Sequence, residues 1–191
     1  MRITLDNNCL VSLDNRDGEY EHIKSLLNLS SEQITVCIPA IAASENQQSG
    51  IVNYNFGQFE EFLKRIGCQK CELLNPMSYY DICYFDRSVW TGEEMVLFEQ
   101  RIHEILFPKI PFRYVEYCAT CGIEPNNAIL DRKWRNAKCD VQAMWCHIEY
   151  KGNIFVSQDN NFHKKTKKSK LIALGAKNIM TPSECLSELT K

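Results

Sequence analysis

Two short apolar runs, far apart in the sequence, both lead to an aspartate, and this pattern constrains the fold most. The first run is residues 3–6 and ends in Asp6, and the second is residues 153–159 and ends in Asp159. Apolar runs of this length, with β-branched and aromatic residues, are typical of buried parallel strands. Because the carboxyl ends of parallel strands meet at one edge of a sheet, the pattern predicts that the two aspartates lie close together.

The rest of the apolar pattern alternates between strand-like and helix-like segments. Further strands are predicted at residues 34–38, 71–74 and 178–180. Helices are predicted at residues 21–29, from Ile41 with an interruption near 49–50 and a continuation over 56–66, at 93–106, from Asp140 onward, at 168–174 and after 181–183. Such alternation favours an α/β fold, and we expect a three-layer α/β/α sandwich with a mainly parallel central sheet.

The length of 191 residues fits a single domain that spans residues 1–191. Residues 68–125 are rich in aromatic side chains and show little clean periodicity outside the amphipathic helix predicted at 93–106. We therefore expect residues 68–125 to be an insertion in the domain, or a helical cap that shapes access to a site.

Composition narrows the class of protein without indicating its activity. The net charge of −2 and the pI near 6.1 do not in themselves indicate nucleic-acid binding. No apolar run approaches the roughly 20 residues that a membrane-spanning helix needs, and no secretory signal pattern is evident, so we expect a cytoplasmic protein. The ten cysteines are then expected to be reduced thiols rather than a disulfide framework.

Two further acids, Glu45 and Asp140, complete a set of four with Asp6 and Asp159. Each lies in a segment that reads as helical and has small or polar neighbours, and Asp140 is expected to begin its helix. Four carboxylates that converge on one pocket repel each other, and bound divalent cations relieve that repulsion. The pattern therefore suggests metal-dependent phosphodiester chemistry.

The segment Leu5-Asp6-Asn7-Asn8-Cys9-Leu10-Val11 resembles the opening of the PIN-domain nucleases, in which an Asp, a small polar residue and an Asn precede an apolar run. The residues from Asp140 to Trp145 and from Gly152 to Phe162 resemble the closing helix, strand and polar turn of that family. The resemblance covers residues 1 to about 50 and about 125 to 191.

The resemblance implies a PIN-like endoribonuclease that uses Mg²⁺ or Mn²⁺ to hydrolyse RNA. It also implies an antitoxin or other regulatory protein as partner, and a homodimer. Asp6, Glu45, Asp140 and Asp159 would be both the catalytic residues and the metal ligands. Each acid also has an ordinary interpretation: Asp6 and Asp140 as helix N-caps, Glu45 as a solvated helix residue, and Asp159 as a turn residue.

Three polar residues are expected to support these acids. Asn8 and Ser157 would hydrogen-bond to the ligand carboxylates or to bound water, as in relatives that carry an amide and a hydroxyl at these places. Asn161 stands where relatives often carry a further Asp, and this difference would weaken a second metal site. Asn7 replaces the commoner Thr or Ser, and we assign it no role.

A run of lysines follows the second acidic turn. Lys164, Lys165, Lys167 and Lys168 are interpreted either as contacts to the phosphate backbone of RNA or as an ordinary solvated face. Four basic residues earlier in the sequence would extend the same positively charged surface, the basic wall. They are Arg132, Lys133, Arg135 and Lys138.

Other interpretations remain open at the level of sequence. Cys68, Cys71, Cys118 and Cys121 form two CxxC pairs with the spacing of a structural zinc site, although we expect no zinc because glycine-rich knuckles do not follow them. The chain would alternatively be a catalytically silent PIN-like scaffold that binds RNA or protein. A phosphohydrolase of the haloacid dehalogenase type is less favoured, because it requires an acid where Asn8 stands.

Overall fold

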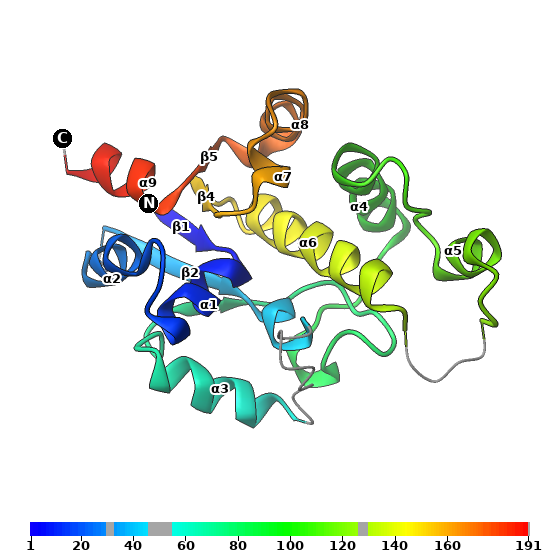
Figure 1. The fold of residues 1–191 in the computed structure, drawn as a ribbon, viewed down its shortest axis with the longest axis horizontal. Helices are drawn as coiled ribbons and strands as arrows, with labels where there is room; N and C mark the ends of the chain where they lie inside the picture. Colours follow the sequence, from blue (N-terminus) through cyan, green and yellow to red (C-terminus); the bar gives the residue numbers. More distant parts are fainter. Residues whose placement is uncertain (30–32, 46–54, 126–129, 191) are drawn as a thin grey trace.

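A parallel five-stranded sheet organises residues 1–29, 33–45, 55–125 and 130–190, which are the residues that the computed structural model describes (Figure 1). The strands are β1 (Arg2–Leu5), β2 (Thr35–Pro39), β3 (Glu72–Leu74), β4 (Ile154–Val156) and β5 (Asn178–Met180). Their order across the sheet is β3-β2-β1-β4-β5, and every neighbouring pair is parallel. The prediction of an α/β fold with a parallel sheet is confirmed.

Helices follow or precede each strand. The α-helices are α1 (Asn7–Asn15), α2 (Tyr20–Asn28), α3 (Phe56–Arg65), α4 (Glu93–Leu106), α5 (Tyr114–Cys121), α6 (Arg132–Glu149), α7 (Asn160–His163), α8 (Lys165–Leu171) and α9 (Pro182–Leu189). Shorter helical turns are η1 (Ala40–Ser44), η2 (Phe85–Arg87) and η3 (Ile172–Ala176). Within the described part of the chain, no helix is long and apolar enough to cross a membrane.

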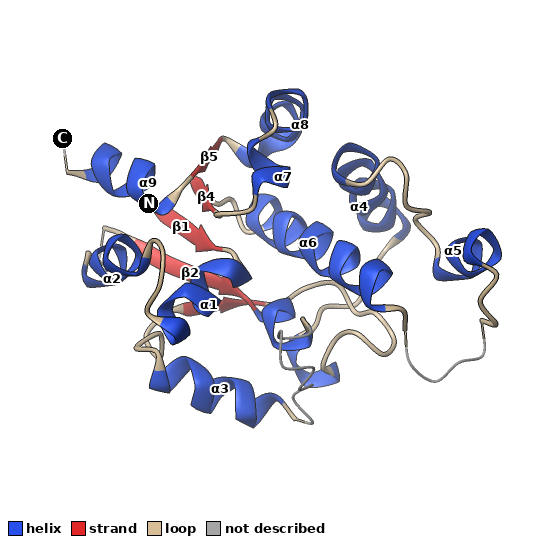
Figure 2. Cartoon of the chain, viewed as in Figure 1, coloured by secondary structure: helices blue, strands red, loops and turns tan. Residues whose placement is uncertain are grey.

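The two faces of the sheet lie in two different hydrophobic cores. Ile3 and Leu5 of β1 pack into one core, together with buried residues of α1, α2, α3 and α9. Phe155 of β4 packs into the other core, with buried residues of α4, α6 and α8. Successive side chains of a strand point to opposite faces, so each strand contributes to both cores. Figure 2 shows the sheet between these two groups of helices.

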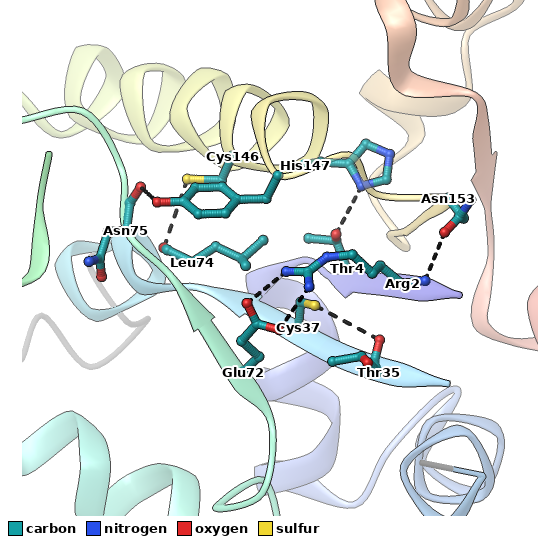
Figure 3. A network of polar contacts seen from close by, with 11 residues as sticks. Arg2, Thr4, Thr35, Cys37, Glu72, Leu74, Asn75, Cys146, His147 and Asn153 are labelled. Atoms are coloured by element: carbon teal, nitrogen blue, oxygen red, sulfur yellow. Dashed lines mark hydrogen bonds and ion pairs between the residues drawn. The ribbon is translucent and has the colours of Figure 1, made fainter. Parts of the chain in front are cut away.

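Polar contacts fix α6 and the edge strand β3 to the sheet at the end away from Asp6 (Figure 3). The guanidinium of Arg2 in β1 donates two hydrogen bonds to the Glu72 carboxylate in β3, at 2.9 and 2.8 Å. The backbone N–H of Arg2 donates to Asn153 Oδ1 at 2.8 Å. This end of the sheet is therefore held by side chains as well as by the strand ladder.

His147 connects the buried face of α6 to β1. Its Nδ1 lies 2.9 Å from Thr4 Oγ1 and its Nε2 lies 2.9 Å from the Ala176 carbonyl oxygen. A carbonyl only accepts, so Nε2 carries the hydrogen and Nδ1 accepts from the threonine hydroxyl. Burial lowers the pKa of His147 to about 4. The imidazole is therefore neutral at pH 7.

The structure corrects three predictions about local structure. A helix that the sequence pattern did not predict, α1, begins directly after Asp6. The segment from Ile41 is the short 3₁₀ turn η1 rather than an α-helix, and the predicted interruption near 49–50 lies outside the described residues. The helix expected to begin at Asp140 begins at Arg132, because Asp131 caps it: Asp131 Oδ1 accepts from Lys133 N at 2.9 Å.

Candidate functional site

The candidate site lies where the sheet order changes direction. From β1 the chain passes to β2 on one side, whereas β4 pairs with β1 on the other side. Ligands of open α/β sheets bind in the crevice at such a switch point, beyond the carboxyl ends of the strands. Asp6 follows β1 and Asp159 follows β4 at this edge, as the two apolar runs predicted.

Asp6 is held rigidly from three directions. One carboxylate oxygen, Oδ1, accepts the backbone N–H of Asn7 at 2.8 Å and so caps α1. The other, Oδ2, accepts from Asn8 Nδ2 at 2.7 Å and from Ser157 Oγ at 2.7 Å. The side chain is only 3% exposed. Asp6 is therefore both the N-cap that the ordinary interpretation proposed and part of the acidic pocket.

Asn8 and Ser157 join the ends of β1 and β4. Asn8 Nδ2 also donates to Ser157 Oγ at 3.0 Å, and Asn8 Oδ1 accepts the backbone N–H of Gln158 at 3.0 Å. Ser157 Oγ in turn accepts the backbone N–H of Asp159 at 3.0 Å. The two residues thus place both aspartates relative to each other, which is the supporting position that the sequence suggested for them.

Glu45 and Asp140 come from opposite sides of the pocket. Glu45 follows η1 with an extended backbone, φ −69° and ψ 132°, and Asp140 lies in the middle of α6. Their carboxyl groups interact with each other, and Glu45 also accepts from the Asn7 side chain. Asp140 is thus neither an N-cap nor a residue favoured by the helix dipole, contrary to the interpretation from the sequence.

The four acids interact electrostatically, and three of them hold protons more tightly than usual. Burial raises the pKa of Asp6 to about 6 and that of Glu45 to about 8. Burial, followed by the charges of Glu45, Asp6 and Asp159, raises the pKa of Asp140 well above its ordinary value. Like charges confined in a desolvated pocket have this effect. The four acids named from the sequence therefore lie near enough to interact electrostatically.

A narrow cavity lies beside two of these acids, Asp6 and Glu45. It has a volume of about 10 Å³, room for about one water molecule. Its lining residues are Asp6, Asn7, Pro39, Ile41, Ala42, Glu45, Cys139 and Ala143. The small side chains of Ala42 and Ala143 leave the space that the Asp6 and Glu45 side chains line, as the small residues before Glu45 suggested.

The donor set has the right chemistry for a hard divalent cation, because Mg²⁺ and Mn²⁺ prefer carboxylate oxygens. Among the residues that the structure describes, however, no three His, Cys, Asp or Glu side chains are grouped so that they could hold one metal ion. Asp6, Glu45, Asp140 and Asp159 are the residues that would supply carboxylate oxygens to such a cation.

Asp159 and Asn161 lie at the start of α7. Asp159 Oδ1 accepts the backbone N–H of Asn161 at 2.7 Å, so this aspartate is also an N-cap. Lys167 Nζ donates to Asn161 Oδ1 and to the carbonyl oxygen of Leu106 in α4. Asn161 Nδ2 is buried and has no hydrogen-bond partner in the described structure. The Asn161 side chain thus contacts Lys167 and not the acids.

The lysine run forms α8 and the residue before it. Lys164 and Lys165 are exposed and Lys168 is partly exposed, whereas Lys167 points inward to α4. The interpretation of Lys167 as a phosphate contact is therefore not supported by its position. Three lysines remain available to a ligand that approaches the carboxyl edge of the sheet.

The proposed basic extension on α6 needs one correction. Lys138 is 1% exposed, and its Nζ donates to Glu99 Oε1 of α4 at 2.8 Å. It therefore belongs to the interior and not to a basic wall. Arg132 and Lys133 are exposed, and Arg135 donates to the carbonyl oxygen of Asp81 at 3.0 Å.

The two CxxC pairs lie apart. Cys68 is buried in the core that contains α3, whereas Cys118 and Cys121 lie on α5, whose Tyr117 belongs to the core on the opposite face of the sheet. The four thiol groups do not converge as a single zinc site requires.

Asn7 is the site residue to which the sequence gave no role. Its backbone N–H is capped by Asp6, its side chain hydrogen-bonds to Glu45, and it lines the cavity. Its place directly after the strand-ending aspartate is the signal that would have identified it.

Comparisons of the chain with protein-family models, with curated proteins and with solved structures find no match. The resemblance to the PIN-domain nucleases thus rests on the segments quoted above.

Proposed function

We propose that the protein is a PIN-like, metal-dependent endoribonuclease whose active site is formed by Asp6, Glu45, Asp140 and Asp159. The observation that supports the proposal is the electrostatic interaction among these carboxyl groups, which come from four separate segments near the carboxyl edge between β1 and β4. Acids with strongly raised pKa values destabilise a fold, so their presence together in a crevice favours a functional role over a structural one.

Mg²⁺ or Mn²⁺, when bound by these acids, would supply an activated water and stabilise the leaving oxygen of the phosphodiester. The residues of the chain position the acids for this role. Asp6 cannot rotate, because Asn8 and Ser157 both donate to its Oδ2. Asn7 orients Glu45 in the same way. Such supporting hydrogen bonds fix the direction of a metal-binding carboxylate.

RNA is the proposed substrate in the cytoplasm, and Lys164, Lys165 and Lys168 are its proposed phosphate contacts. These side chains are exposed or partly exposed and follow directly after the turn that contains Asp159. Phosphate contacts of this kind position the strand without selecting its sequence. The preference for RNA over DNA rests on the resemblance to the PIN-domain nucleases.

A catalytically silent PIN-like scaffold is the second candidate. Two observations favour it: no three acids in the described part of the chain are grouped for one metal ion, and Asn161 replaces an acid and contacts Lys167. The haloacid dehalogenase type is disfavoured, because Asn8 donates to Asp6 where that class needs an acid.

Cleavage assays distinguish the two candidates. The purified protein is incubated with labelled single-stranded RNA and DNA in Mg²⁺, Mn²⁺ or a chelator. We expect cleavage of RNA that requires the metal and that Asp140→Asn reduces at least 100-fold, since the variant loses a metal-binding charge.

The matched control is Glu149→Gln, which makes the same kind of change on an exposed residue of the same helix. It should cleave at the parent rate. Equal rates for Asp140→Asn and the parent would remove Asp140 from the site, and no metal-dependent cleavage of any substrate would support the scaffold.

A further inference from the structure

A second, much larger pocket lies between α4 and α5, the helices at the right of Figure 1. Its volume is about 630 Å³, within the usual range for binding pockets. Its lining residues are Met77, Ser78, Tyr79, Thr91, Val96, Glu99, Phe112, Arg113, Tyr114, Val115 and Glu116. None of them belongs to the acidic site, and the walls are mainly apolar.

Hydrogen bonds and cation–π contacts hold the floor of this pocket in place. Glu99 is 2% exposed, and its Oε1 accepts from Lys138 Nζ at 2.8 Å and from Gln142 Nε2 at 2.7 Å. The Lys138 ammonium lies 4.0 Å from the ring centroid of Phe112 and 4.6 Å from that of Tyr79. These cation–π contacts fix two aromatic walls of the pocket before any ligand binds.

Apolar side chains are exposed at the rim of the pocket. Val115 is 65% exposed and Val96 is 38% exposed, and both line the pocket. Trp90, which is 80% exposed, immediately precedes the lining residue Thr91 and forms an edge-to-face pair with the exposed ring of Phe85. Exposed apolar groups beside a preformed hollow are typical of surfaces that bind another protein.

The charge around the pocket indicates the chemistry of that partner. Lys138 neutralises the buried Glu99, so the exposed charged side chains beside the pocket decide the sign of its rim. Glu93 and Glu94, in the first turn of α4, and Glu116 are exposed, and Arg113 is the cation among the lining residues. These three exposed acids outnumber Arg113, so lysine and arginine side chains of a partner would be attracted to the rim of the pocket.

We propose that this pocket binds a basic segment of a partner protein, with one large apolar side chain inserted between Val96, Phe112 and Val115. Lysine or arginine residues on either side of that anchor pair with Glu93, Glu94 and Glu116. The anchor supplies most of the affinity, and the charge pairs supply orientation and the rate of association. The proposal does not depend on the nuclease activity.

The test selects random 12-residue peptides, displayed on phage, on the immobilised full-length protein. We expect enriched peptides that combine Leu, Ile, Phe or Trp with flanking Lys or Arg. A synthetic copy of the best peptide, labelled and followed by fluorescence anisotropy, should bind at least tenfold more weakly to Val115→Asp. It should also bind more weakly at higher salt and to the Glu93→Lys, Glu94→Lys double variant.

Leu97→Asp is the matched control, because Leu97 is 55% exposed on the same helix as Val96 but does not line the pocket. Its affinity for the peptide should stay within twofold of the parent. Both substitutions are at exposed positions, and circular dichroism verifies that each variant is folded. RNA cleavage, where present, should be equal in all of these proteins.

Three results would overturn the proposal: no enriched peptide, enriched peptides without basic residues, or equal affinity of the parent and Val115→Asp. A single-stranded RNA decamer is also tested for displacement of the peptide from the parent. If that RNA displaces the peptide, and binds Leu97→Asp but not Val115→Asp, the pocket binds nucleic acid and not a peptide. If the parent forms dimers at high concentration and Val115→Asp does not, the pocket binds a second copy of this chain.

Discussion

At the scale of single residues, Asp6 shows that a structural and a functional interpretation of an acid need not exclude each other. The same carboxylate caps α1 through Oδ1 and receives two side-chain hydrogen bonds through Oδ2. Its ligation of a metal would have to use lone pairs that these bonds leave open. The N-cap position explains why the chain turns into a helix at the strand end, and so why Asn7 reaches Glu45.

The raised pKa values predict an unusual dependence of stability on pH. Glu45 ordinarily titrates near 4.5 but its pKa is about 8 in the folded protein, so the folded state binds more protons than the unfolded state between these values. The free energy of unfolding should therefore fall as the pH rises from about 4.5 to 8. Glu45→Gln should flatten this fall and stabilise the protein at pH 8 by on the order of 1 to 3 kcal/mol.

Urea unfolding in the presence of a chelator, at pH 5, 6, 7 and 8, measures this effect. Glu149→Gln, an exposed position on α6, is the control and should retain the slope of the parent. A parent protein whose stability does not fall between pH 6 and 8 would show that the acids do not interact as described.

At the scale of elements, the packing of α6 against the sheet depends on the close approach of Gly152 to His147. A Cβ atom at this position would lie 2.2 Å from His147 Nδ1 and 2.9 Å from the His147 carbonyl oxygen. His147 cannot move away without losing its bonds to Thr4 and Ala176. Gly152→Ala should therefore destabilise the protein by about 2 to 4 kcal/mol.

The matched substitution is Gly92→Ala, because a Cβ atom at Gly92 meets nothing within 4 Å and its φ of −93° suits any residue. It should change the free energy of unfolding by less than about 1 kcal/mol. The melting temperatures of both variants are compared at pH 7. Equal melting temperatures would show that the contact between Gly152 and His147 accommodates a Cβ atom.

The lysine helix offers a second test at this scale. Changing Lys164, Lys165 and Lys168 to Gln should weaken RNA binding and flatten the slope of log affinity against log salt by about 0.7 for each phosphate that a lysine no longer neutralises. Lys167→Gln should leave that slope unchanged, because its ammonium contacts Leu106 and Asn161 instead. Binding is measured without metal, and an unchanged slope in the triple variant would place the RNA elsewhere.

At the scale of the whole molecule, the sequence predicted the features that depend on a local pattern of residues. The parallel strands, helix α4 and the meeting of Asp6 with Asp159 follow from apolar runs and from the general geometry of parallel sheets. Convergence of all four acids was suggested by their places in the sequence and then by the resemblance to a family, and the electrostatic coupling of their carboxyl groups agrees with it.

What could not be predicted depends on contacts between distant residues. Lys138 appeared to be a surface charge because its partner, Glu99, is 39 positions away and on another helix. Helix α1 was not predicted, because its first residues are fixed by Ser157 and Gln158, near the other end of the chain. The pocket between α4 and α5 is likewise a product of packing that no periodicity in residues 68–125 indicates.

The pairing of β1 with β4 has a consequence for the chain while it is being synthesised. Asp6 and Glu45 emerge from the ribosome early, but Asp140 and the Ser157 that orients Asp6 emerge more than 90 residues later. At ordinary translation rates this interval lasts roughly five to twenty seconds. During this interval the nascent chain holds two of the four acids of the candidate site, so the site cannot be complete before β4 has joined the sheet.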